Sequence, residues 1–180
     1  MYQIRLHGRG GQGVVTAAEM LSVAAFMEGH FAQAFPSFGS ERTGAPVVAF
    51  ARVDEKAIRL HEPIQEPDVL LEQVDVFAGL HPQGYVLINS EHSLKELGLD
   101  KIAQTMPEGH VRTVPATRFA MQKIGRPLPG AAMLSGYAAM TGQLKLESVQ
   151  AAYAERFSGK VAEANAEVAR LAYEYLTEKV

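Results

Sequence analysis

The stretch that decides the fold is YQIRLHGRGGQGVVTAAEMLSVAAFM, residues 2–27. In its first part Tyr2, Ile4 and Leu6 alternate with polar residues, which predicts a half-buried strand. A glycine cluster follows, and then an apolar segment with helical periodicity runs from Val14 to Met27. A strand, a tight turn and a helix in this order predict the first unit of an α/β fold.

Strand and helix patterns continue to alternate through the first two-thirds of the chain. Short apolar runs predict further strands at Phe31–Phe35, Val47–Val53, Ala57–Leu60, Val69–Leu71, Tyr85–Asn89 and Val111–Val114. Helices are predicted at Ser93–Leu99 and Thr117–Gly125, and a loop is predicted at Pro36–Pro46. We therefore expect an α/β fold with a mostly parallel sheet and crossover helices, of the Rossmann-like or flavodoxin-like type.

The C-terminal part of the chain predicts helices only. From Ala131 onward strand patterns disappear, and Leu146, Val149, Tyr153 and Phe157 fall at helical spacing. Two final helices are separated at residues 158–159, where the serine is a candidate N-cap. Because nothing marks a domain boundary, residues 1–180 are expected to form a single domain.

Composition excludes several classes of function. The net charge of −3 lacks the positive excess of a nucleic-acid-binding surface, so no nucleic-acid partner is expected. The absence of cysteine excludes thiolate chemistry and cysteine-held zinc or iron–sulfur clusters in this chain. The N-terminus lacks a signal-peptide pattern and Val14–Met27 is too short to span a bilayer, which predicts a cytoplasmic protein without a membrane span.

The glycine cluster is the sharpest chemical signal. It is a G-x-G-x-x-G sequence between a predicted strand and a predicted helix, so its backbone N–H groups and the helix N-terminus would face a common anion such as a phosphate. An arginine adds a cation, and a glutamine adds an amide donor. A tight turn that binds nothing is the alternative. The candidate binding residues are Gly8, Arg9, Gly10, Gly11, Gln12 and Gly13.

A dinucleotide site would also need an acidic residue at the end of the second strand to hold the ribose hydroxyls. The second predicted strand, Phe31–Phe35, offers no carboxylate. This counts against NAD, but not against another ligand that carries a pyrophosphate.

A second candidate element is the loop PSFGSERTGAP, residues 36–46. Ser40 and Arg42 could bind a phosphate or a carboxylate, Arg42 in a bidentate manner, if the loop lies near the glycine turn. The alternative is a surface pair between Glu41 and Arg42 that binds no ligand. The six histidines show no metal-binding spacing, and each is interpreted as a surface or satisfied core residue.

Two motifs in order, LHGRGGQG at residues 6–13 and SFGSERTGAPV at residues 37–47, resemble the gamma subunit of the 2-oxoacid:acceptor oxidoreductases, the pyruvate:ferredoxin oxidoreductase family. Residues 84–90, 115–117, 125–129 and 160–173 also look like that family, so the resemblance covers nearly the whole chain.

The resemblance implies a subunit of an enzyme that decarboxylates a 2-oxoacid, passes electrons to ferredoxin or another acceptor, and usually releases an acyl-CoA. It implies partner subunits of the alpha, beta and ferredoxin-like delta types, which would carry thiamine diphosphate, Mg and [4Fe-4S] clusters. This chain would lie near coenzyme A as co-substrate, would hold no catalytic residue or metal, and would be inactive alone. The alternatives are a stand-alone NAD- or flavin-binding oxidoreductase domain and a scaffold subunit without a ligand.

Overall fold

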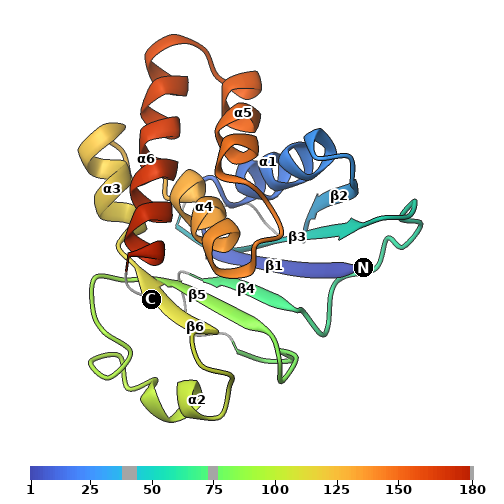
Figure 1. The fold of residues 1–180 in the computed structure, drawn as a ribbon, viewed down its shortest axis with the longest axis vertical. Helices are drawn as coiled ribbons and strands as arrows, with labels where there is room; N and C mark the ends of the chain where they lie inside the picture. Colours follow the sequence, from blue (N-terminus) through green and yellow to red (C-terminus); the bar gives the residue numbers. More distant parts are fainter. Residues whose placement is uncertain (38–43, 73–76, 179–180) are drawn as a thin grey trace.

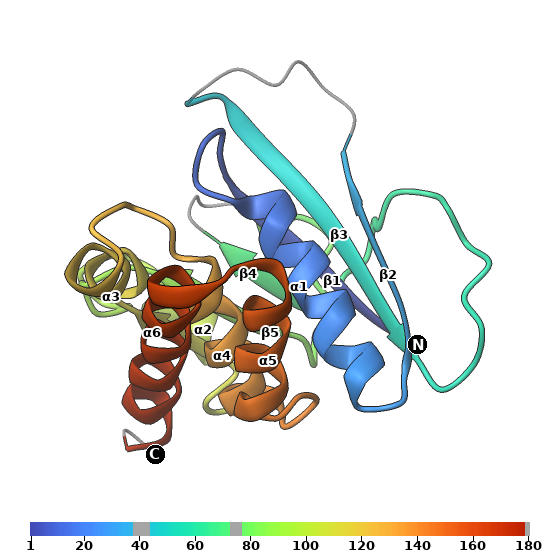
Figure 2. The ribbon, with the colours of Figure 1, turned by 90° about the horizontal axis from the view of Figure 1, so that it is seen from above.

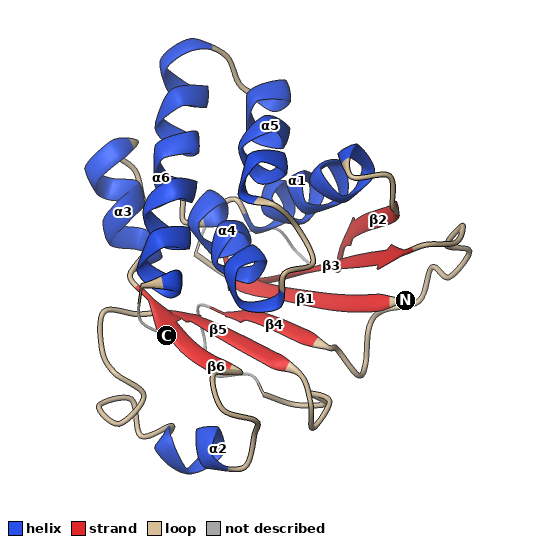
Figure 3. Ribbon diagram, viewed as in Figure 1, coloured by secondary structure: helices blue, strands red, loops and turns tan. Residues whose placement is uncertain are grey.

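The computed structural model describes residues 1–37, 44–72 and 77–178. These form one six-stranded sheet with a layer of helices on one face (Figures 1 and 3). The strand order is β2-β3-β1-β4-β5-β6. The strands are β1 (Tyr2–Arg9), β2 (Phe31–Pro36), β3 (Pro46–Asp54), β4 (Val69–Glu72), β5 (Tyr85–Asn89) and β6 (Val111–Val114).

The sheet is mixed, and only one strand opposes the rest. Strand β1 pairs in parallel with β4, β4 with β5, and β5 with β6. Strand β3 is antiparallel to both of its neighbours, β1 and β2, so β2 points the same way as β1. The expected α/β fold with a mostly parallel sheet is therefore confirmed, although β3 lies between β1 and β2, where a Rossmann unit would pair these two strands directly.

The main helical layer packs on one face of the sheet, and α2 (Asp100–Gln104) lies on the other (Figure 1). The main layer consists of α1 (Val14–Met27), α3 (Ala116–Lys123), α4 (Gly130–Thr141), α5 (Leu146–Arg156) and α6 (Gly159–Thr177). Helix α4 contacts the sheet on one side and the α5–α6 pair on the other (Figure 1). In the view from above, these three helices overlap one another beside α1 (Figure 2). The expected helical C-terminal segment is thus confirmed.

Helix α4 is packed so closely at Gly136 that a side chain there would have to displace its neighbours. A Cβ atom on Gly136 would lie 2.5 Å from Leu87 on β5 and 2.9 Å from Leu176 on α6. Glycine therefore allows α4 to contact the sheet and α6 at the same time. The first residue of this helix, Gly130, borders the candidate site.

Two predicted elements are wrong. Residues 57–60 form no strand, because Arg52 takes the backbone oxygen of Leu60 as a hydrogen-bond acceptor and holds the segment as a loop. The predicted helix at Ser93–Leu99 is also absent, because residues 94–98 form only turns. Ser93 and Glu96 do make the reciprocal capping hydrogen bonds of a helix start. Gly98, however, adopts a φ of 70° and ends the turn.

The other boundaries agree with the sequence to within about two residues. Ser158 does stand at the N-cap of α6, but its side chain makes no capping hydrogen bond. The predicted loop at residues 36–46 is shorter in its described part, because β2 includes Pro36 and β3 begins at Pro46.

A buried arginine holds the β3–β4 connection against the sheet. Arg52 is 1% exposed, and its guanidinium donates to the side-chain oxygens of Gln3 (3.3 Å) and Gln33 (3.4 Å) on the neighbouring strands. It also donates to the backbone oxygens of Leu60 (3.4 Å) and Glu62 (2.6 Å). One side chain thereby joins three strands to the loop that leads into β4.

A buried histidine occupies the same face of the sheet near the end of β1. His7 is 8% exposed, and its Nε2 atom has no hydrogen-bond partner in the described part of the chain. The interpretation of His7 as a satisfied core residue is therefore wrong for this atom. Burial, and secondly the positive charge of Arg5, lower the pKa of His7 to about 4.

We predict that Arg52→Met lowers the free energy of unfolding by about 2–4 kcal/mol, because several partly buried oxygen acceptors lose their charged donor. Urea unfolding measures this change, and limited proteolysis should cut residues 55–68 faster in the variant. Arg59→Met, on the exposed part of the same loop, is the matched control and should change little. Equal stability of the two variants would contradict the role assigned to Arg52.

We also predict a pH dependence that originates at His7. Above pH 6.5 the imidazole is neutral in both states, whereas between pH 6.5 and about 4 only the unfolded chain takes up the proton. Stability is therefore lost as the pH falls through this window, by up to about 1.4 kcal/mol per unit. His7→Gln should unfold with a weaker acid dependence than the wild type in urea titrations at pH 7 and 4.5. His92→Gln, at an exposed position, is the matched control substitution.

Candidate functional site

The glycine turn connects β1 to α1 as the sequence predicts. Strand β1 ends at Arg9, and α1 begins at Val14 with Gly13 as its N-cap residue. Gly11 has a φ of 91° and Gly13 a φ of 75°, in the left-handed region that residues with a Cβ atom rarely adopt. The two glycines are thus required by the backbone path of the turn itself.

The turn leaves several donors free. Gln12 closes it, because its N–H donates to the Arg9 oxygen (3.1 Å) and its side-chain Oε1 accepts the Arg9 N–H (2.7 Å). The backbone N–H groups of Gly11, Gly13 and Val14 meet no acceptor among the described residues. A Cβ atom on Gly11 would meet nothing within 4 Å, so the space in front of the turn is open. Free N–H groups at a helix N-terminus form an anion site.

The C-terminal end of the second motif, at residues 44–45, lies against the glycine turn of the first motif. The Gly10 N–H donates to the Ala45 oxygen (2.8 Å), and the Gly44 N–H donates back to the Gly10 oxygen (3.1 Å). The Arg9 guanidinium donates to the Gly44 oxygen at 3.2 Å. Residues 44–45 thus lie directly against the glycine turn. Ser40 and Arg42, the other two predicted site residues, lie outside the described residues.

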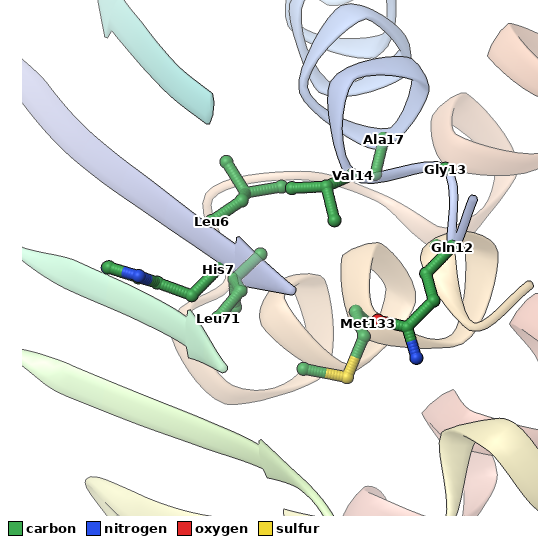
Figure 4. Close-up of a pocket in the computed structure, with 9 residues that line it drawn as sticks. Leu6, His7, Gln12, Gly13, Val14, Ala17, Leu71 and Met133 are labelled. Atoms are coloured by element: carbon green, nitrogen blue, oxygen red, sulfur yellow. The ribbon is translucent and has the colours of Figure 1, made fainter. Parts of the chain in front are cut away.

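A small pocket lies beside the turn at the carboxyl ends of β1 and β4 (Figure 4). Figure 4 shows Leu6, Val14 and Gln12 around it, from β1, the first turn of α1 and the glycine turn. Its volume of about 20 Å³ suits a water molecule. The chain that leaves β1 leads through α1 to β2 on one side, and the chain that leaves β4 leads to β5 on the other, so the pocket lies where the strand order diverges. This is the usual ligand position in open α/β sheets. The His7 ring points away from Gln12, so His7 offers no chemistry toward the turn.

A larger pocket of about 130 Å³ adjoins the small one, and Gln12, Gly13 and Gly130 line both. Its other lining residues come from α1, from the α3–α4 connection and from the α5–α6 pair: Thr16, Ile124, Leu128, Tyr153, Phe157, Val161 and Asn165. Sequence reasoning missed this pocket. The available signal was Asn165, a polar residue that is only 6% exposed on the buried face of α6.

The strand order argues against a dinucleotide site. In that arrangement the second strand lies next to the first, so an acidic residue at its end reaches the ribose beside the glycine turn. Here β3 separates β2 from β1, and β2 ends in Phe35 and Pro36. Both the sequence of β2, which has no carboxylate, and its position, which is not next to β1, therefore argue against an NAD site.

The described residues contain neither a candidate metal site nor a candidate membrane-spanning helix. No group of three or more His, Cys, Asp or Glu side chains that could hold a metal ion occurs there. None of the helices in the described part of the chain is long and apolar enough to cross a membrane.

Comparisons with known proteins identify the family. The model of the pyruvate ferredoxin/flavodoxin oxidoreductase family matches residues 3–175. The common gamma subunit of the pyruvate/ketoisovalerate oxidoreductases of Pyrococcus abyssi is 49% identical, with 97% of this chain and 96% of the relative covered. The crystal structure of the pyruvate oxidoreductase subunit PORC of Thermotoga maritima is 32% identical, with a TM-score of 0.77 and coverage of 96% and 95%.

The fold also occurs inside a larger chain. The 2-oxoglutarate:ferredoxin oxidoreductase of Magnetococcus marinus, solved with 2-oxoglutarate, coenzyme A and succinyl-CoA bound, matches with a TM-score of 0.72 at 14% identity. The match covers 99% of this chain and 31% of that one. Together with the glycine turn and the nearly full-length matches, these findings establish that the chain belongs to the pyruvate ferredoxin/flavodoxin oxidoreductase family, as a subunit of its gamma type.

Proposed function

We propose that this chain binds the phosphate end of coenzyme A in a multi-subunit 2-oxoacid oxidoreductase. The observation that carries the proposal is the set of N–H groups of Gly11, Gly13 and Val14 at the N-terminus of α1, which meet no acceptor among the described residues. A Cβ atom on Gly11 would meet nothing within 4 Å, and Arg9, whose guanidinium donates to the Gly44 oxygen, belongs to the same turn. The turn therefore offers hydrogen-bond donors together with a positive charge. A phosphate group has the acceptor oxygens and the charge that this position favours.

Each candidate residue has a separate role in the proposal. Gly8, Gly10, Gly11 and Gly13 let the backbone approach the ligand, and Gln12 holds the turn closed through Arg9. Because residues 44–45 pair with the turn, we propose that the loop of residues 36–46 also brings Ser40 and Arg42 to the phosphates. Arg42 would then supply two parallel charged donors.

The redox chemistry is assigned to the partners. We propose alpha, beta and delta-type partner subunits that carry thiamine diphosphate, Mg and [4Fe-4S] clusters, with ferredoxin or another protein as acceptor, in a cytoplasmic complex. The chain itself has no cysteine to ligate a cluster, and its described residues offer no metal-binding group. Bound thiamine diphosphate would supply the decarboxylation chemistry, whereas the residues of this chain orient the acyl acceptor.

One prediction of the proposed function concerns the glycine turn. In the assembled complex, Gly11→Val should raise the KM for coenzyme A, because its side chain enters the space in front of the turn. Gly109→Val is the matched control, since Gly109 has a similar φ (79° against 91°) and also faces open space. Arg42→Ala should raise the KM about ten- to hundredfold, as expected for the loss of a charge-assisted contact. Oxoacid-driven reduction of the clusters should stay close to wild type in all three variants.

The outcomes of this experiment separate the alternatives. If Gly11→Val and Arg42→Ala leave the KM for coenzyme A unchanged, the turn is structural and the scaffold function is favoured. If cluster reduction falls together with coenzyme A use, the site acts on an earlier step than acyl transfer.

Another prediction of the proposed function concerns the isolated chain. Expressed alone, it should bind neither thiamine diphosphate nor iron and should not oxidise 2-oxoacids, because the groups that hold these cofactors are on other subunits. Visible absorbance, iron analysis and a dye-reduction assay test this, with the assembled complex as the positive control. Stoichiometric clusters or turnover in the isolated chain would contradict the assignment.

A further inference from the structure

Strand β6, at one end of the sheet, has an unpaired outer edge. It is the last strand in the sheet order, with α2 on one face of the sheet and α6 on the other (Figure 1). The backbone oxygens of His110 and Val114 accept hydrogen bonds from the β5 side, at 2.7 and 3.0 Å. Because backbone groups alternate between the two edges of a strand, Val111 and Thr113 direct theirs to the outer edge, where no strand of the described part pairs with them.

This outer edge lies in an open groove of about 480 Å³, the β6 groove. Its floor is formed by residues 111–113 of β6. One wall comes from residues 93–95 and α2, and the other comes from Tyr175 on α6. Unpaired backbone groups on an edge strand are a template for pairing with another chain. The β6 groove therefore has the form that strand addition requires, a row of free backbone groups between two walls.

The two walls differ in chemistry. On the α2 side, Val111 is buried, and Leu94 and Ala103 pack against the same apolar cluster. On the α6 side, the Arg112 guanidinium donates to the Leu176 oxygen at 2.8 Å, which holds the cation at this wall. The side chains of an added strand alternate between the two walls. The groove thus fits a segment in which small apolar residues alternate with residues that pair with a cation.

The charge of the groove favours an acidic segment. Among its lining residues Lys95 and Arg112 are cations, whereas Asp100 is an anion. The β6 groove is therefore positive on balance, in a chain whose net charge is −3. A carboxylate opposite Arg112 gains a cross-strand partner of opposite charge, and complementary charge also speeds association.

The same charge argues against a second copy of this chain as the occupant. In an antiparallel pair of two β6 strands, the register that uses the free groups of both Val111 and Thr113 places Arg112 opposite its own counterpart. Like charges directly opposite each other destabilise a strand pair. Because the chain is a gamma-type subunit of a multi-subunit oxidoreductase, the fitting source of the strand is another subunit of that complex.

We propose that the β6 groove receives an extended segment of a partner subunit, which adds a seventh strand to the sheet. The backbone of this segment pairs with Val111 and Thr113. Its acidic side chains face Arg112, and its small apolar side chains face Leu94 and Ala103. The groove shares no lining residue with the two pockets beside the glycine turn, so the inference stands apart from the proposed function.

A proline variant tests the backbone pairing in the assembled complex. Thr113→Pro removes an outward N–H and leaves the ladder to β5 intact, as proline on edge strands does. It should weaken association of this chain with the complex at least about tenfold, because the proline ring fills the pairing position. Dilution followed by native mass spectrometry measures this change. Thr113→Ala keeps the N–H and is the matched control, which should assemble like the wild type.

Hydrogen exchange reports on the same pairing at a neighbouring amide. In the wild-type complex the Val111 amide should exchange at least about tenfold more slowly than in the Thr113→Pro complex, because the added strand supplies its acceptor. Equal exchange rates at Val111 in the two complexes would overturn the proposal.

A charge reversal tests the partner's chemistry. Lys95→Glu should weaken association about three- to tenfold at low salt, and less at high salt. Lys101→Glu is the matched control, since Lys101 is an exposed lysine of α2 that does not line the groove. If Thr113→Pro fails to fold, this comparison still decides. Equal association of the two lysine variants would overturn the acidic segment.

Zero-length carbodiimide cross-linking of the wild-type complex identifies the source of the strand. Lys95 should be joined to an aspartate or glutamate of a different subunit, within a stretch that has apolar residues at alternate positions. A link from Lys95 to a second copy of this chain would overturn the assignment to a partner subunit.

Discussion

The backbone pairing between Gly10 and residues 44–45 is the constraint on which the candidate site depends. The β1–β3 ladder runs to Arg9 and Pro46, and two further hydrogen bonds carry it into the glycine turn. Because β3 is antiparallel to β1, its start lies at the carboxyl end of β1. The chain entering β3 is therefore held against the phosphate-binding candidate, and the two motifs that are more than twenty residues apart in sequence meet.

Close helix packing completes the other side of the site. Gly136 lets α4 contact β5 and α6 together, and Gly130 at the start of α4 leaves room for the Tyr153 hydroxyl beside α1. The helices around the larger pocket are thus held mainly by one another: α4 also contacts the sheet, whereas α5 packs on α1, α4 and α6. A rigid frame of this kind holds donors in place before the ligand arrives, which lowers the ordering cost of binding.

The sequence predicted most of the secondary structure because strands and helices here follow hydrophobic periodicity closely. Helix α1, strand β5 and strand β6 have the predicted bounds. The failures have two physical causes. Arg52 donates to the Leu60 oxygen that a strand would need, and Gly98 adopts a left-handed conformation, so residues 94–98 form only turns. Neither event can be read from a short window of residues.

By itself, the sequence determined the α/β class and the position of the glycine turn between a strand and a helix, because both follow from local hydrophobic periodicity. Two of its motifs carried the resemblance to the family. Only the tertiary structure decided that β3 separates β1 from β2, which removes the position of a ribose-binding carboxylate. It also decided that Gln12, Gly130, Tyr153 and Asn165 line one pocket. These residues come from separate elements, and their meeting depends on strand order and helix packing, which local periodicity does not specify.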